Sequence, residues 1–330
     1  MSLLEVENLS TSFFQEDKEI KVLRDVSFSL DRGKVLGIVG ESGSGKSITV
    51  YSILGLLPPG AKITSGSVKL NGEELIGAPE SFMQKIRGNR ISIIFQDPMT
   101  SLNPTITIGN QLTEAILLHT GMSKREAEGR AEEILRTVNI GDPKRRMKQF
   151  PYELSGGMRQ RIMIAIALAT EPDVLIADEP TTALDVTIQA SILELMTSLQ
   201  KRLGTSIIMI THDLGVIAKT CDEVIVMYAG AVAERGTTEE IFYNPRHEYT
   251  KGLLRSVPSP ENVGKKLSSI KGNVISLDKI TEGCPFTSRC DEAMKICKVK
   301  NADELMINEN HAVRCWINQR DRILNSKEES

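Results

Sequence analysis

Residues 40–47 read Gly40-Glu41-Ser42-Gly43-Ser44-Gly45-Lys46-Ser47, a glycine-rich loop that ends in lysine and serine. Apolar residues 35–39 lead straight into the loop, so a short buried strand is expected before it and a helix after it. Glycines in such a phosphate-binding loop, or P-loop, let backbone N–H groups turn towards phosphate oxygens. Lys46 would offset charge on the β- and γ-phosphates, and the Ser47 hydroxyl would reach Mg²⁺. An ordinary glycine turn would not need this lysine-serine ending. The stretch therefore predicts a nucleoside triphosphate site.

Other apolar segments predict an α/β fold with a mainly parallel sheet flanked by helices. The buried-strand candidates are residues 91–95, 174–177, 206–210 and 223–227. Residues 4–9 and 22–30 indicate an antiparallel β portion near the N-terminus. Residues from about 97 to 151 have helical periodicity instead, and Ser123 with Glu126 has the spacing of a capping box. We interpret them as a helical subdomain.

Composition narrows the class of protein. The 330 residues carry a net charge of -3, without the basic excess of a nucleic-acid-binding protein, so no nucleic-acid partner is expected. The longest apolar run, residues 162–169, is far shorter than the roughly 20 residues of a membrane-spanning helix. The first residues do not resemble a signal peptide, so we expect the chain in the cytosol, where its cysteines would not form stable disulfides.

Two acidic residues follow the apolar strand candidate at residues 174–177. Asp178 stands at the carboxyl end of that strand, where it could hold Mg²⁺ directly or through water. Glu179 is the candidate for the group that polarises the attacking water. The alternative is a solvated loop carboxylate.

A second glycine motif starts a predicted helix. Residues 154–160 read Leu154-Ser155-Gly156-Gly157-Met158-Arg159-Gln160, and the helix continues through residues 162–169. Exposed N–H groups at its start form an anion site, yet the P-loop already serves this chain's own phosphates. The alternative is an ordinary helix start, although paired glycines normally destabilise a helix.

The order and spacing of these motifs resemble the ATP-binding subunits of ABC transporters. The resemblance implies that Ser155, Gly156 and Gly157 cap the γ-phosphate of ATP held by an opposing subunit, so that ATP binding closes a dimer and hydrolysis opens it. Met158 stands where the family more commonly has glutamine, which leaves the backbone donors intact. A homodimer and a heterodimer with a sister ATPase are equally compatible, and no second P-loop is present in the sequence.

The same resemblance assigns four further residues. Gln96 resembles the Q-loop glutamine, a ligand for Mg²⁺ or the water, and His212 resembles the switch histidine that contacts the γ-phosphate. Asp185 falls in the D-loop, which would run along the dimer seam. Phe13 falls where the family stacks an aromatic ring on adenine; Phe14 competes for this role, and a packed core phenylalanine is the alternative.

Longer strings resemble the ATPase subunits of bacterial dipeptide and oligopeptide importers, from about residue 3 to 320. They are residues 95–104 (FQDPMTSLNP), 154–161 (LSGGMRQR) and 244–247 (NPRH), with Glu248 where the family usually has proline. Membership implies ATP-driven import at the cytoplasmic face of a membrane, with two permease subunits docked on the helical subdomain, a sister ATPase and an extracellular binding protein. Nickel and other peptide-like importers share the pattern. A nucleic-acid-linked ABC ATPase is less favoured, because residues 48–154 carry no sustained heptads.

Four cysteines lie beyond a linker near residues 258–266: Cys284, Cys290, Cys297 and Cys315. We expect a nucleotide-binding domain over residues 1–250 and a C-terminal extension over 251–330. Four clustered thiolates suit a metal centre, and their spacings are looser than those of most zinc sites. A [4Fe-4S] cluster fits the ligand count, and the resemblance implies one; zinc and unliganded thiols are the alternatives. His311 could replace a thiolate in a zinc site or be a solvent-exposed histidine.

Overall fold

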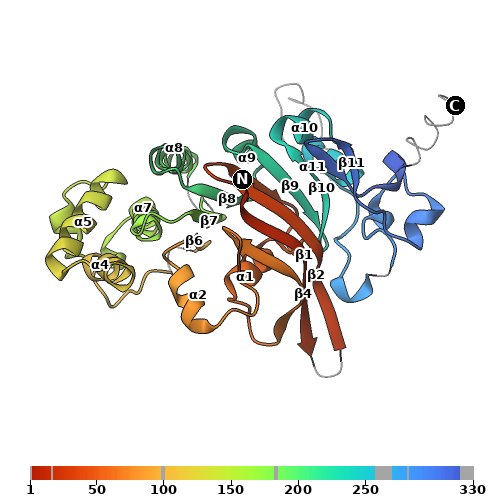
Figure 1. The fold of residues 1–330 in the computed structure, drawn as a ribbon. Coiled ribbons are helices and arrows are strands. Elements are labelled where there is room, and N and C mark those ends of the chain that lie inside the picture. The colour runs from red at the N-terminus through yellow and green to blue at the C-terminus, as the bar shows by residue number, and fades with distance from the viewer. Residues whose placement is uncertain are drawn as a thin grey trace. The chain divides into compact units, whose positions relative to one another are not determined.

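The computed structural model describes residues 2–15, 18–97, 101–181, 185–256, 270–280 and 282–319. They divide into two compact units (Figure 1). One unit, here called the helical unit, comprises residues 30–35 and 77–210. The other, here called the P-loop unit, comprises residues 2–29, 36–76 and those from 211 onward.

The helical unit contains a parallel sheet of β6 (Ile91–Ile94), β7 (Val174–Asp178) and β8 (Ser206–Ile210), with β7 in the middle. All five residues of β7 are buried. A strand covered on both faces needs a continuous apolar sequence, which this one has up to its last residue. The polar end of β7 therefore delivers Asp178 to the carboxyl edge of the sheet.

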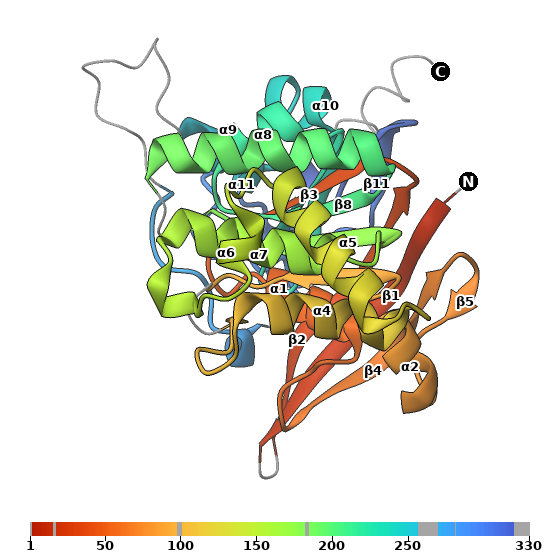
Figure 2. The same cartoon turned by 90° about the vertical axis from the view of Figure 1, so that its left-hand side faces the viewer.

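Helices make up the rest of this unit. They are α2 (Glu80–Ile86), α4 (Ile108–His119), α5 (Lys124–Thr137), α6 (Pro143–Arg146), α7 (Gly156–Leu168) and α8 (Val186–Leu203), with a 3₁₀ turn at Pro151–Glu153. In both views α4, α5 and α7 lie together, and they bury apolar side chains such as Ile116, Leu135 and Ile164 (Figures 1 and 2). The predicted capping box is confirmed, because Ser123 N–H donates to Glu126 and Glu126 N–H donates to Ser123 Oγ.

Two sheets form the P-loop unit. The first has the antiparallel order β2 (Lys18–Asp31), β1 (Ser2–Gln15), β4 (Ala61–Leu70) and β5 (Glu73–Glu74), as the N-terminal pattern predicts. In the second, β3 (Val35–Val39) pairs in parallel with β9 (Glu223–Tyr228). Strands β10 (Ala231–Thr237), β12 (His311–Val313) and β11 (Leu305–Asn308) continue it in antiparallel fashion. Helix α1 (Lys46–Leu54) follows the P-loop.

The last described strands are paired onto this second sheet, because β12 pairs with β10. The remaining elements of the unit are α9 (Leu214–Thr220), α10 (Thr238–Tyr243), α11 (Glu248–Arg255) and 3₁₀ turns at Leu277–Lys279, Thr287–Arg289 and Lys295–Lys298. Strands β10, β11 and β12 are absent from the elements predicted from the sequence. The latter two are only four and three residues long, and their pairing depends on partners distant in sequence. The predicted linker at residues 258–266 lies outside the described residues.

His311 corrects one expectation from the sequence. Its side chain is fully buried on β12, with Nε2 2.7 Å from Glu234 Oε1 and Nδ1 3.3 Å from Glu240 Oε2. It is therefore neither solvent-exposed nor among the residues that line the cavity of the four thiols described below.

Candidate nucleotide-binding site

The P-loop has the backbone geometry that a phosphate cradle needs. Gly40 has φ +152°, and a Cβ there would lie 2.2 Å from the carbonyl oxygen of Met227. Gly45 has φ +101°, and its Cβ would lie 2.9 Å from a methyl carbon of Leu23. Only glycine fits these two positions without displacement of the neighbouring atoms. The loop then opens directly into α1, whose first turn contains no acidic residue to compete with a phosphate.

Lys46 is held against this loop. Its ammonium group donates to the carbonyl oxygens of Gly40 at 2.8 Å and Glu41 at 3.0 Å, and only 7% of the residue is exposed. A buried lysine that is hydrogen-bonded to the carbonyls of its own loop can exchange one of these contacts for a phosphate oxygen. The predicted residues from Gly40 to Ser47 thus form one continuous loop whose geometry suits an anion.

Three other predicted residues, His212, Phe13 and Phe14, lie in the P-loop unit. His212 and Asp213 are exposed after β8, and Asp213 caps α9 by accepting N–H groups of Gly215 and Val216. Phe13 is half-buried on β1 opposite Ala61. Phe14 is 44% exposed, with the Lys62 ammonium 5.9 Å from its ring centre.

The helical unit brings two predicted catalytic residues into contact. Gln96 Nε2 donates to Glu179 Oε2 at 2.7 Å, although the residues are 83 positions apart in the chain. Glu179 directly follows β7 and has a left-handed φ of +48°. This conformation is costly for a side chain larger than glycine, so surrounding contacts must hold it. A hydrogen bond from Glu179 N–H to the carbonyl of Ile210 holds it, at 2.9 Å. Asp178 is 4% exposed beside it.

The second glycine motif forms the start of α7. Ser155 is its exposed N-cap and accepts the N–H of Met158, while Gly157 packs so closely on α8 that a Cβ would lie 3.0 Å from Ile188. Asp185 caps α8 by accepting the N–H of Ile188 at 2.9 Å. The rest of the predicted D-loop, residues 182–184, lies outside the described residues. At the start of α7, Ser155 is exposed, Gly156 is half-buried and Gly157 is buried, and the first turn contains no acidic residue.

Several residues that support the site are not recognisable from the sequence motifs. Gln160 is buried on α7 and donates to the Pro180 carbonyl at 2.6 Å, which anchors the segment after Glu179. Glu41 is visible in the P-loop motif, but its partners, Tyr249 and Arg289, are more than 200 positions away. The sequence signal for Gln160 is its place inside the second glycine motif. The sequence offers no comparable signal for Tyr249 or Arg289.

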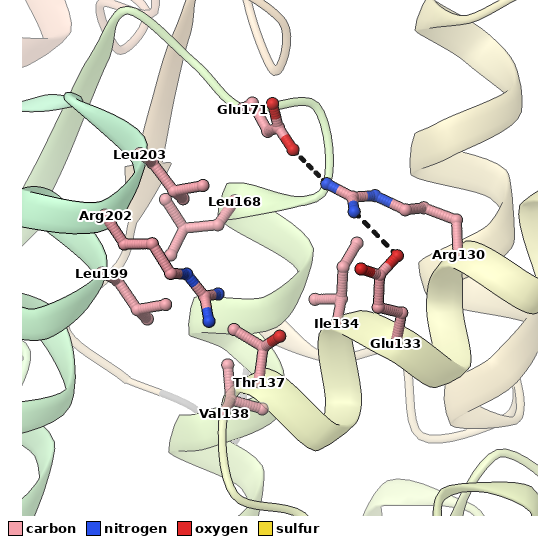
Figure 3. A pocket seen from close by; sticks show the side chains of 10 residues that line it. All are labelled: Arg130, Glu133, Ile134, Thr137, Val138, Leu168, Glu171, Leu199, Arg202 and Leu203. Carbon is pink, nitrogen blue, oxygen red and sulfur yellow. Dashed lines mark hydrogen bonds and ion pairs between the residues drawn. The ribbon is translucent and has the colours of Figure 1, made fainter.

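A cavity of about 300 Å³ in the helical unit is separate from these residues (Figure 3). It lies among α5, α7 and α8 over an apolar floor that includes Ile134, Leu168 and Leu199. At its edge Arg130 pairs with both Glu133 and Glu171. None of the predicted nucleotide-site residues lines it, so it is a gap in the helix packing and not the ATP site.

All four C-terminal cysteines line one cavity in the P-loop unit, beside Phe286 and Trp316. They are free thiols, and burial raises the pKa of Cys284, Cys315 and Cys290, the last to about 11. Among the residues that the structure describes, no group of three or more histidine, cysteine or acidic side chains is arranged to hold a metal ion. The thiols thus share a cavity without forming a closed ligand set.

Within the described part of the chain, every helix is too short or too polar to cross a bilayer. The glycine loop between β3 and α1, the acidic end of β7 and the glycine-rich start of α7 are the features expected of an ATPase of the ABC class.

Comparisons with known proteins are specific. The family described as "ABC transporter" matches residues 23–182, and "Oligopeptide/dipeptide transporter, C-terminal region" matches residues 233–297. The dipeptide transport ATP-binding protein DppD of Bacillus subtilis is 51% identical over 96% of this chain and 94% of the relative. The oligopeptide transport ATP-binding protein OppD of Salmonella typhimurium is 50% identical over 89% and 88%. The dimeric ATP-binding cassette MJ0796, solved with ADP and Pi, has a TM-score of 0.64 and 28% identity over 71% of this chain and 98% of that one.

The chain therefore belongs to the family of ATP-binding subunits of dipeptide and oligopeptide ABC transporters, ATPases whose hydrolysis is coupled to transport.

Proposed function

We propose that this chain binds Mg²⁺-ATP on its P-loop and hydrolyses it to power import of dipeptides or oligopeptides through a membrane permease. The hydrogen bond between Gln96 and Glu179 is the observation that carries the hydrolytic part, because it ties two candidate water-handling groups together. About 50% identity to dipeptide and oligopeptide relatives over most of the chain supports the cargo. Substitution of Glu179, developed in the Discussion, is the test.

Each residue of the site receives a role. Lys46 offsets phosphate charge, and P-loop N–H groups bind phosphate oxygens. The oxygens of Ser47, Gln96 and Asp178 suit Mg²⁺, which prefers hard ligands and would neutralise charge on the transferred phosphoryl group. Glu179 polarises the attacking water, His212 contacts the γ-phosphate and Phe13 stacks on adenine. Asp178 is the buried carboxylate expected of such a ligand.

The ATP site is completed by a second ATPase subunit, either a sister ATPase or another copy of this chain. Ser155, Gly156 and Gly157 cap the γ-phosphate bound by that partner, and Asp185 lies along the seam. The N-terminus of α7 supports this arrangement, because Ser155 is exposed, the first turn has no acidic residue, and backbone N–H groups at a helix start favour an anion. The dimeric state of the cassette MJ0796 with ADP and Pi also supports it. The assembly sits at the cytoplasmic face of the membrane, with two permease subunits and, indirectly, an extracellular substrate-binding protein.

The helical subdomain, residues from about 97 to 151, docks on the permease. A surface hollow on α4 supports this proposal, because it is lined by Ile106, Thr113, Leu117 and Leu118 among others. Leu118 is 72% exposed and the adjacent Leu117 38%, so neighbouring apolar side chains are open to a partner there.

Leu118→Asp should remove most permease from the complex, because a carboxylate cannot enter an apolar contact without losing its hydration. Pull-down from membranes measures the association, and ATP binding should be unchanged. Arg125→Asp, an exposed change on the neighbouring helix α5, serves as the matched control and should retain permease. Equal recovery of permease with both variants would contradict docking at this surface.

We also propose that Cys284, Cys290, Cys297 and Cys315 hold a [4Fe-4S] cluster, with zinc as the alternative. The cavity that they share supports this ligand set, because such clusters and some zinc sites are held by four thiolates. Closing the set needs movement of the side chains, because the described residues do not form it already. Metal–thiolate bonds would supply folding energy to this segment.

Anaerobically purified protein should be brown, with broad visible absorbance and about four iron atoms per chain. Cys290→Ser should lose both signals. Cys221→Ser should keep them, because Cys221 is a buried thiol outside the cavity, with a pKa raised by burial to about 12. Colourless protein with stoichiometric zinc would show that the site holds zinc and not the cluster. Metal-free protein would exclude both metals.

A further inference from the structure

One P-loop residue is tied to the C-terminal cysteine segment, residues 282–319. Both carboxylate oxygens of Glu41 accept from the Arg289 guanidinium, at 2.6 and 3.0 Å. Arg289 directly precedes Cys290, and its side chain is 3% exposed. Paired parallel hydrogen bonds of this kind fix geometry as well as charge. The link crosses 248 positions of sequence and ends inside the phosphate-binding loop.

Arg289 is itself firmly held. Its Nε donates to the Lys271 carbonyl at 2.9 Å, and its guanidinium lies 5.8 Å from the ring centre of Tyr228 and 5.9 Å from that of Phe286. A guanidinium group stays charged in proteins, so Arg289 carries a full positive charge beside Glu41. An arginine stacked on aromatic rings and bonded on its edge has little freedom to follow a moving partner.

The main chain of Glu41 is held as well. Its N–H donates to the Tyr249 hydroxyl at 2.8 Å, and Tyr249 is fully buried against Tyr228 and Phe286. The Glu41 carbonyl accepts from Lys46 Nζ at 3.0 Å. The position of the phosphate-binding lysine therefore depends on a residue whose side chain and N–H are both anchored by α11 and the cysteine segment.

The charge of Glu41 makes the arginine necessary. A carboxylate in the P-loop repels nucleotide phosphates, and the repulsion is strong where water is excluded. The paired Arg289 cancels that charge before nucleotide arrives. We propose that Arg289 is a positioning residue of the nucleotide site, through which the C-terminal cysteine segment sets the affinity for nucleotide. The inference rests on the proposed P-loop site and is independent of what the four thiols bind.

A double-mutant cycle on the charges of Glu41 and Arg289, made in the full chain, tests this link. Arg289→Gln should raise the Kd for a fluorescent ADP analogue with Mg²⁺ about tenfold, because Glu41 is then unbalanced. The double variant Glu41→Gln/Arg289→Gln should return to within about threefold of Glu41→Gln alone. KM for ATP should rise with little change in kcat, and Arg289→Lys should fall between wild type and Arg289→Gln.

Arg235→Gln is the matched control. Arg235 also makes two hydrogen bonds to a carboxylate of the extension, Glu304, at 3.0 and 2.9 Å, without contacting the P-loop. It should lower thermal stability and leave the Kd unchanged. The link would be overturned by an unchanged Kd in Arg289→Gln. It would also be overturned if Arg289→Gln and the double variant Glu41→Gln/Arg289→Gln lost the same affinity. Failure of wild-type protein to bind the analogue would instead reject the P-loop site itself.

Discussion

Glu179→Gln should lower ATP turnover about 100- to 1000-fold while leaving ATP binding intact. The amide cannot take a proton from the attacking water, which is the role proposed for the carboxylate. It has the same shape and can still accept the hydrogen bond that Gln96 Nε2 donates at 2.7 Å. The left-handed backbone at this position should also be retained, because the Ile210 carbonyl still accepts its N–H. Steady-state phosphate release and equilibrium nucleotide binding measure the two effects.

The same variant should accumulate as a closed dimer with Mg²⁺-ATP, since binding closes the sandwich and hydrolysis no longer opens it. Size-exclusion chromatography with and without nucleotide, in the presence of the sister subunit where one exists, reports this shift. Glu171→Gln provides the control, because Glu171 is a paired carboxylate of the same unit that makes its contact to Arg130 instead. Undiminished turnover of Glu179→Gln would reject its role as the base.

The sequence predicts best those features whose residues are neighbours along the chain. An apolar strand, a glycine loop and a helix follow one another at residues 35–54, so the P-loop is recognisable without any tertiary information. The strand that ends at Asp178 and the capping box of Ser123 with Glu126 are local in the same sense. Each depends on neighbours a few positions away, and local pattern therefore suffices.

Features that depend on distant partners were beyond the sequence. Neither a glutamate in the P-loop nor an arginine beside a cysteine indicates a pair, because the pairing of Glu41 with Arg289 exists only after α11 and the cysteine segment have packed. His311 likewise reads as a surface histidine or a ligand until β12 pairs with β10 and buries it on Glu234. Free energy of burial and pairing, not local propensity, decides these positions.

Gly40→Ala should raise the Kd for nucleotide by more than about 100-fold, the second large effect. The new Cβ would lie 2.2 Å from the Met227 carbonyl oxygen and 2.6 Å from Ser44 Oγ. A main-chain oxygen cannot rotate away as a side chain can, so the loop must shift to relieve the contact. That shift moves the Gly40 carbonyl, which accepts a hydrogen bond from the Lys46 ammonium at 2.8 Å. Loss of the lysine and of aligned N–H groups removes several charge-assisted contacts to phosphate at once.

Gly43→Ala separates the steric cause from backbone preference. Gly43 also has a positive φ, +77°, yet a Cβ there meets nothing within 4 Å. It should cost only the preference of alanine against left-handed backbone, about 1 kcal/mol, and raise the Kd less than about tenfold. Titration with a fluorescent ADP analogue measures both variants, and thermal unfolding checks that both fold. Equal loss of affinity would show that backbone flexibility of the loop, rather than the contact between Gly40 and Met227, controls phosphate binding.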